Sequence, residues 1–107
     1  MSAVFQSCTL KCVLFGYACH STTLATTEWS GDYAGFAMLA LEQRLPGTDA
    51  LFFQGCGADQ NPIPRGSADI CKKYGALLAT GVETALSQPM RQIKPSLATA
   101  FDFVELK

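Results

Sequence analysis

Several features that would narrow the class of protein are missing or rare in this chain of 107 residues. It contains one histidine and one tryptophan, and only 16% of its residues are charged. The net charge is −1 and no basic run is present, so nothing indicates binding to nucleic acid or to an anionic membrane surface. The longest apolar runs fall far short of the roughly 20 residues that a transmembrane helix needs. The first 12 residues lack the basic start and apolar stretch of a secretory signal.

The five cysteines do not form a recognisable framework. They are irregularly spaced, at Cys8, Cys12, Cys19, Cys56 and Cys71. Their odd number argues against a regular set of disulfides, and no Cys-x-x-Cys pair indicates a thioredoxin-like redox site or a zinc ribbon. We expect most of them to be reduced and to pack as small apolar side chains, Cys12 and Cys19 among them.

Almost half of the residues are hydrophobic, so the chain can bury a core, and its length suits a single small domain over residues 1–107. The continuous apolar run 10–18 predicts a strand that is buried on both faces. Residues 30–45 place apolar side chains at helical spacing, and Ser30 is the expected cap of this helix. A second short, buried strand is predicted at 50–54.

The second half of the chain repeats this alternation. After a loop at 55–66, a helix is predicted over 67–87, with Ser67 as its cap. Its expected apolar face consists of Ile70, Tyr74, Leu77, Leu78, Gly81 and Ala85. The alternating side chains of 97–105 predict a closing strand with one covered face. The order β-α-β-α-β favours an α/β fold, in which helices flank a mixed or parallel sheet.

Polar residues gather where the two predicted strands end. His20 follows the first strand, and the loop from Gly55 to Arg65 follows the second. Loops at the carboxyl ends of neighbouring parallel strands share one edge of the sheet, so we expect the His20 ring to face this second loop. A plainer interpretation remains open, in which His20 is an ordinary hydrogen-bonded loop residue and Gly55 and Gly57 only form a tight turn.

Three stretches resemble the N-terminal catalytic domain of the neutral/alkaline non-lysosomal ceramidases. In order, they are VLFGYACHSTTL, SGDYAGFAMLALE and ALFFQGCGADQNPIPR. The resemblance covers nearly the whole chain from about Leu10. Members of that family are zinc amidases that hydrolyse the N-acyl bond of ceramide to sphingosine and a fatty acid. The resemblance therefore implies Zn²⁺ as the cofactor and a ceramide-like lipid as the substrate.

The resemblance assigns His20 to a histidine that is one of the family's zinc ligands. Ser21 stands where the family commonly has proline after this histidine. A catalytic zinc normally has three protein ligands and an open position, and the family's other ligands lie in segments before and after this stretch. The resemblance thus implies an interior piece of a larger catalytic domain, inactive alone and completed by the missing parts of that domain.

GADQNP (Gly57–Pro62), in the third stretch, matches the family's Gly-Asp-Val-Ser-Pro type of loop, with Asp59 and Pro62 aligned. This match makes Gly57, Asp59 and Gln60 candidate residues of a substrate or active-site loop. The family's nucleophilic serine falls at Asn61, which cannot form an acyl-enzyme. Direct attack by water is then favoured, with Asn61 or nearby backbone amides orienting the substrate or supporting the oxyanion.

A different class of function also fits the sequence. The alternative is a non-catalytic α/β module that folds or binds a partner without metal. In that interpretation Asp32 is a helix-end carboxylate, and Trp29 and Tyr33 are ordinary core or rim aromatics.

Overall fold

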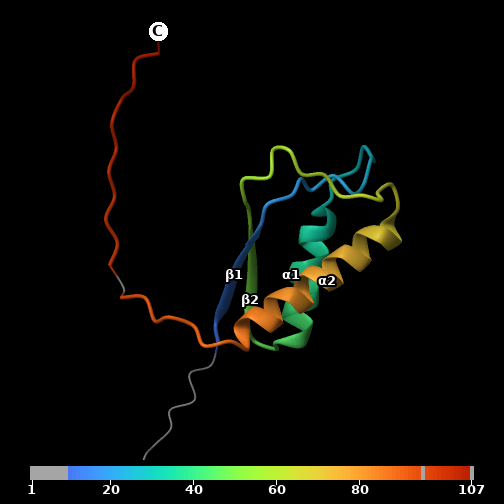
Figure 1. The fold of residues 1–107 in the computed structure, drawn as a ribbon, viewed down its shortest axis with the longest axis horizontal. Coiled ribbons are helices and arrows are strands. Elements are labelled where there is room, and N and C mark those ends of the chain that lie inside the picture. Colours follow the sequence, from blue (N-terminus) through green and yellow to red (C-terminus); the bar gives the residue numbers. More distant parts are fainter. Residues whose placement is uncertain (1–9, 95, 107) are drawn as a thin grey trace, which may run out of the picture.

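The computed structural model describes residues 10–94 and 96–106. They form strand β1 (Cys12–Tyr17), helix α1 (Asp32–Arg44), strand β2 (Asp49–Gln54) and helix α2 (Ala68–Leu86). This order confirms a small α/β arrangement, and each of these elements lies within two residues of its predicted limits (Figure 1).

The two strands pair in parallel, and both helices lie on the same side of them (Figure 1). A parallel pair needs a crossover connection, which α1 provides. On the helix side, one core cluster of buried residues joins both strands to both helices. Its members are Val13, Phe15, Ala37, Leu41, Ala50 and Ala79. The Phe15 and Phe52 rings meet edge to face there, with 5.5 Å between their centroids.

One or two residues determine how each helix begins. Ser67 caps α2 as predicted, because its Oγ accepts a hydrogen bond of 3.2 Å from the Ile70 N–H. The prediction for α1 was wrong by one position: Gly31 is the N-cap residue and makes no side-chain cap. Ser30 instead accepts from the Asp32 N–H.

Within the described residues, neither helix has the length and apolarity to cross a membrane.

The face of α2 that is buried differs from the predicted one. The helix buries Cys71, Gly75 and Ala79, a row of small side chains at intervals of four residues. A Cβ on Gly75 would lie only 2.5 Å from the Cβ of Phe36, so the small residue is what allows the two helices to approach. Of the predicted face, Tyr74 and Leu78 are half-buried against the core, whereas Leu77 is 58% exposed. The small side chains of this row therefore determine how closely α2 approaches α1, and larger apolar side chains such as Leu78 and Val82 pack at the sides of the contact.

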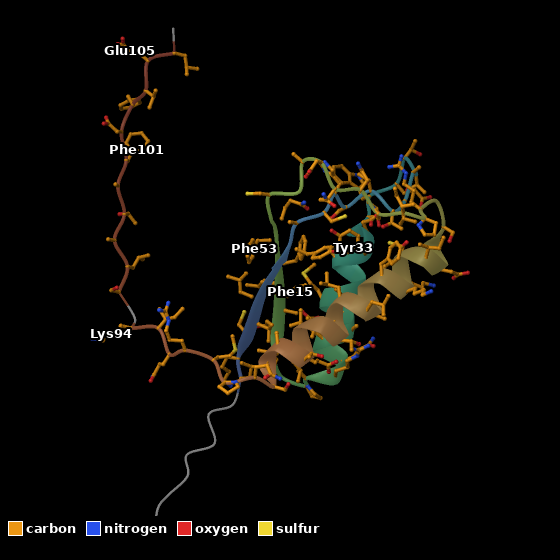
Figure 2. The ribbon with its side chains drawn as sticks, in the orientation of Figure 1. Phe15, Tyr33, Phe53, Lys94, Phe101 and Glu105 are labelled. Carbon is orange, nitrogen blue, oxygen red and sulfur yellow. The ribbon has the colours of Figure 1, made fainter. Side chains whose placement is uncertain are left out.

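The prediction that the first strand is buried on both faces was wrong. On β1 only the side chains that face the helices are buried, and Leu14 on the other face is 66% exposed. Leu51 and Phe53 on β2 are each 52% exposed. Figure 2 shows Phe53 on the side of the strands opposite to Phe15 and Tyr33. No described element covers this second face.

The predicted closing strand is also absent from the described residues. Residues 96–106 have no regular secondary structure and lead away from the strands (Figures 1 and 2). Apolar side chains such as Leu97 and Phe101 are more than 80% exposed, so neither face of the segment is covered. An alternating sequence forms a strand only when a neighbouring strand accepts its backbone hydrogen bonds, and this segment has no such neighbour among the described elements.

The cysteine prediction holds in part. Four described cysteines are free thiols, as expected. Cys19 and Cys71 are buried, but Cys12 and Cys56 are exposed, so the packing role expected for Cys12 was wrong. Cys12 lies at the start of β1, where it pairs with Asp49 of β2 and its side chain alternates with that of the buried Val13. Cys8 is outside the described residues.

Candidate functional site

The loops that follow β1 and β2 are in direct contact at the carboxyl end of the sheet. The Gly55 N–H donates to the Tyr17 carbonyl at 3.1 Å, which continues the strand pairing into the loops. Gly57 then passes so close to the first loop that a Cβ on it would lie 2.4 Å from the carbonyl carbon of Ala18. Since the atoms on both sides are backbone, only glycine fits at position 57 without displacing a loop.

His20 joins the two loops through both its backbone and its ring. Its N–H donates to the Gln60 carbonyl at 3.0 Å, and its Nε2 lies 3.1 Å from the Ala58 carbonyl oxygen. The prediction that the ring faces the second loop is therefore confirmed. A carbonyl can only accept, so this contact requires the proton on Nε2 and leaves the lone pair of the neutral ring on Nδ1.

The loop residues singled out by the sequence do not all lie together. Asn61 is exposed, and its Oδ1 accepts a hydrogen bond of 3.3 Å from the hydroxyl of Thr22, two residues after His20 in the chain. With its oxygen used in this way, the Asn61 side-chain amide N–H₂ group is left as a donor. Asp59 is exposed and makes no hydrogen bond or ion pair with the residues that the structure describes.

A groove of about 480 Å³ opens beside these loops, between the second loop and α2. This volume lies within the range of ligand-binding clefts. Its lining residues are Tyr17, Cys19, Tyr33, Gln60, Asn61, Pro62, Ile63, Tyr74, Leu77, Leu78 and Gly81. Most of these are apolar or aromatic, and the adjacent polar residues Gln60 and Asn61 belong to the wall that the second loop forms. The groove brings Gln60 and Asn61 together, whereas His20, Gly57 and Asp59 are not part of its lining.

Sequence reasoning missed the part of this groove that α2 forms. Tyr74, Leu77, Leu78 and Gly81 belong to the helix face that the sequence predicted to be its core side. The signal was present in their helical spacing, which was interpreted only as the apolar face of the helix. The Tyr74 hydroxyl also donates to the Pro64 carbonyl at 2.8 Å, which ties the second loop to the helix.

Tyr33 supports the residue that precedes His20. Its hydroxyl donates to the Cys19 carbonyl at 2.6 Å, and the Gln54 Nε2 donates to the same oxygen at 2.7 Å. Burial raises the pKa of Tyr33 to about 12, so its hydroxyl remains a proton donor at neutral pH. Tyr33 is therefore a structural donor to the His20 loop, and this role goes beyond that of the core or rim aromatic expected from the sequence.

Asp32 is a buried carboxylate at the start of α1. Its Oδ2 accepts from the Leu24 N–H at 2.8 Å, and its Oδ1 accepts from the Tyr33 N–H at 2.7 Å. Burial by itself raises the pKa of this carboxyl, but the two backbone hydrogen bonds and the neighbouring Thr23 outweigh it and hold the pKa below its usual value. The carboxylate is therefore ionised at neutral pH although it is shielded from water.

The residues that the structure describes do not make a zinc site on their own. They contain no group of three or more His, Cys, Asp or Glu side chains that could hold a metal ion. His20 offers one nitrogen, whereas a catalytic zinc normally takes three protein ligands. Among the described residues, the zinc ligation implied by the resemblance has His20 as its one assigned ligand, and it remains a prediction.

Comparison with protein-family models, with curated proteins and with solved structures finds no match to this chain. The resemblance to ceramidases therefore rests on the three sequence stretches alone. In the fold, His20 is hydrogen-bonded to the second loop, and this loop forms one wall of an apolar groove.

Proposed function

We propose that this chain forms one wall of the active site of an amide hydrolase that acts on ceramide-like lipids, within a larger catalytic domain. The observation that carries the proposal is the contact between the two loops. His20 is hydrogen-bonded to Ala58 and Gln60, and the next residue, Asn61, lies on the wall of an apolar groove. The histidine and the Gly57–Pro62 loop, both singled out by the resemblance, are thus in contact.

The chemistry of the groove suits an N-acyl lipid. Apolar side chains such as Ile63, Leu77 and Leu78 provide a wall for a hydrocarbon chain, while Asn61 offers an amide donor at its side. In amide hydrolysis, negative charge develops on the carbonyl oxygen, and a fixed N–H donor stabilises it. Asn61 cannot act as the nucleophile that a serine would be, so water attacks the carbonyl carbon. The C–N bond then breaks. The oxygen of the attacking water remains on the acyl carbon, and a proton from that water goes to the amine that leaves.

The open face of the sheet supports the idea of a larger domain. Leu14, Leu51 and Phe53 form an exposed apolar surface on the side that no helix covers. We assign this surface to the remainder of the same catalytic domain, which would also supply the metal ligands that this chain lacks. The alternative is a non-catalytic module, in which the same surface receives a partner and no amide bond is cleaved.

The test uses the product of the complete reading frame that contains this sequence, with a fluorescent ceramide as substrate. We expect Asn61→Ala to lower kcat on the order of a hundredfold to a thousandfold, as for the loss of one oxyanion donor. His20→Ala should lower both activity and zinc content, because it removes a ligand. Gln43→Ala, which removes an exposed amide from the outer part of α1, serves as the matched control and should retain full activity.

The outcomes separate the two classes of function. Full activity in Asn61→Ala would refute the role of the second loop, and retention of both zinc and activity in His20→Ala would refute the assignment of the histidine. A complete protein that cleaves no N-acyl lipid with zinc supplied would leave the non-catalytic module as the better interpretation.

A further inference from the structure

The first two residues of α1 hold both ends of the short loop that contains His20. Tyr33 donates to the carbonyl of Cys19, directly before the histidine, at 2.6 Å. Asp32 accepts from the N–H of Leu24, four residues after the histidine, at 2.8 Å. The loop is thus held before and after His20 by hydrogen bonds to Tyr33 and Asp32, which are adjacent in the chain.

The contact made by Asp32 is not an ordinary helix cap. A capping carboxylate accepts from N–H groups two or three residues further along its own helix. Asp32 instead reaches back eight residues to Leu24, and its other oxygen accepts from the N–H of the next residue, Tyr33. The carboxylate therefore connects the loop to the helix.

The backbone of Asp32 also departs from ordinary geometry. Its φ is +50°, in the left-handed region that few non-glycine residues occupy, although Asp tolerates it better than most. Such a conformation persists only where surrounding contacts fix it. The Ser30 hydroxyl provides one such contact, because it accepts from the Asp32 N–H at 3.0 Å.

Thr23 extends the connection to the second loop. Its carbonyl accepts from the Gly66 N–H at 2.7 Å, at the far end of that loop. Its side chain is fully buried, and its hydroxyl makes no hydrogen bond of standard geometry with the described residues. The segment next to Leu24 is thus held by the Asp32 carboxylate on one side and by Gly66 on the other.

We propose that Asp32 is a positioning residue, whose carboxylate fixes the loop 19–24 so that His20 stays against the backbone of Ala58 and Gln60. It acts through the loop and touches neither groove nor substrate. The value of this positioning for catalysis rests on the proposed function, whereas the mechanical role of Asp32 does not.

The experiment measures the loop in the full chain by NMR. His20 is the only histidine, so its ring signals are assigned without ambiguity. The readouts are the exchange rate of the His20 amide hydrogen and the nuclear Overhauser contact between its ring and Ala58. Asp32→Gly removes both acceptor oxygens but keeps the left-handed conformation accessible, and Asp32→Asn keeps one acceptor. Asp69→Asn makes the same chemical change at the exposed first turn of α2 and is the matched control.

We expect Asp32→Gly to speed His20 amide exchange about tenfold, the factor for one lost hydrogen bond to a charged group, and to weaken the contact with Ala58. Asp32→Asn should lie between this variant and the wild type, and Asp69→Asn should leave His20 unchanged. Unchanged His20 exchange in Asp32→Gly would overturn the proposal, as would an equal acceleration along the whole of α1.

If Asp32→Gly fails to fold, Asp32→Asn decides by the same criterion. Selective acceleration at His20 then supports the proposal, and none refutes it. No lipid is hydrolysed in these measurements, so their result is separate from the fate of the proposed function.

Discussion

The two faces of the sheet are made of similar residues but have different surroundings. On the helix side, Val13 and Phe15 are buried under α1 and α2. On the other side, Leu14 of the same strand and Phe53 of its neighbour are more than half exposed. Because the side chains of a strand alternate between the faces, a continuous apolar run marks a strand suited to cover on both sides. Among the described elements, α1 and α2 cover one face of the sheet, and the other face is left uncovered.

This difference separates a packed side from an open side. The packed side comprises the helix-covered face together with the linked loops at the carboxyl edge, and it contains the candidate site. The open side comprises the uncovered face and the segment 96–106, where Phe101 and Phe103 contact one another. The geometry of the site should therefore depend on residues of the packed side and hardly at all on those of the open side.

The sharpest contrast is between two leucines. Leu41 is 1% exposed at the centre of the packed side, and Leu41→Ala should lower the free energy of unfolding by about 2–5 kcal/mol through lost burial and a residual cavity. Leu14→Ala, on the open face, should cost less than roughly 1 kcal/mol because most of its side chain is already in water. Urea denaturation of both variants measures the difference. Equal losses would mean that the open face is covered in solution.

A second contrast is between two glycines. Gly57→Ala forces a Cβ into the backbone of Ala18 and should cost about 1–3 kcal/mol, as overpacking does. Gly35→Ala, inside α1, meets no atom within 4 Å and should stabilise the chain by roughly 0.5–1 kcal/mol through helix propensity. Thermal unfolding of both variants provides the comparison. A neutral Gly57→Ala would show that the two loops do not meet as described.

The smallest effect is on stability at alkaline pH. Burial, and then the nearby Asp32 carboxylate, raise the pKa of the Cys71 thiol from 9.0 to about 11. The folded state therefore keeps this proton while the unfolded chain loses it. The contribution of Cys71 to the free energy of unfolding is fully present below pH 9. It is lost as the pH rises toward 11, and the loss reaches about 1 kcal/mol at pH 10.

Urea midpoints at pH 8 and pH 10 measure this loss, with Cys71→Ala as the comparison. The variant should lose less stability between the two pH values than the wild type does. An identical loss in both proteins would show that Cys71 is not the group responsible.

The order and limits of the helices and strands could be predicted because local residues determine them. Ser67 starts α2, and Pro46–Gly47 follows the end of α1, where Gly47 has a φ of +81°. The closing strand at 97–105 could not be judged from its alternation alone, since a strand also needs a neighbour to pair with. The buried face of α2 was missed because the small side chains of Gly75 and Ala79 determine how closely the helices approach.

The site was predictable only where topology alone decides it. The meeting of His20 with the second loop follows from two parallel strands that end at one edge. The roles of Asp32 and Tyr33 do not follow from this topology. They depend on how the start of α1 lies against the loop that follows β1. The groove likewise depends on the final position of α2 beside Ile63, which no local pattern encodes.

The most direct measurement compares zinc content and ceramide hydrolysis in two proteins, the 107-residue chain alone and the product of its complete reading frame. With a single imidazole among its candidate ligands, the chain alone should hold no stoichiometric zinc and cleave no ceramide. The complete product should retain zinc and release sphingosine and a fatty acid. A stoichiometric, chelator-resistant zinc in the chain alone, or a complete product without zinc or hydrolysis, would contradict the assignment of this chain to one wall of an amidase site.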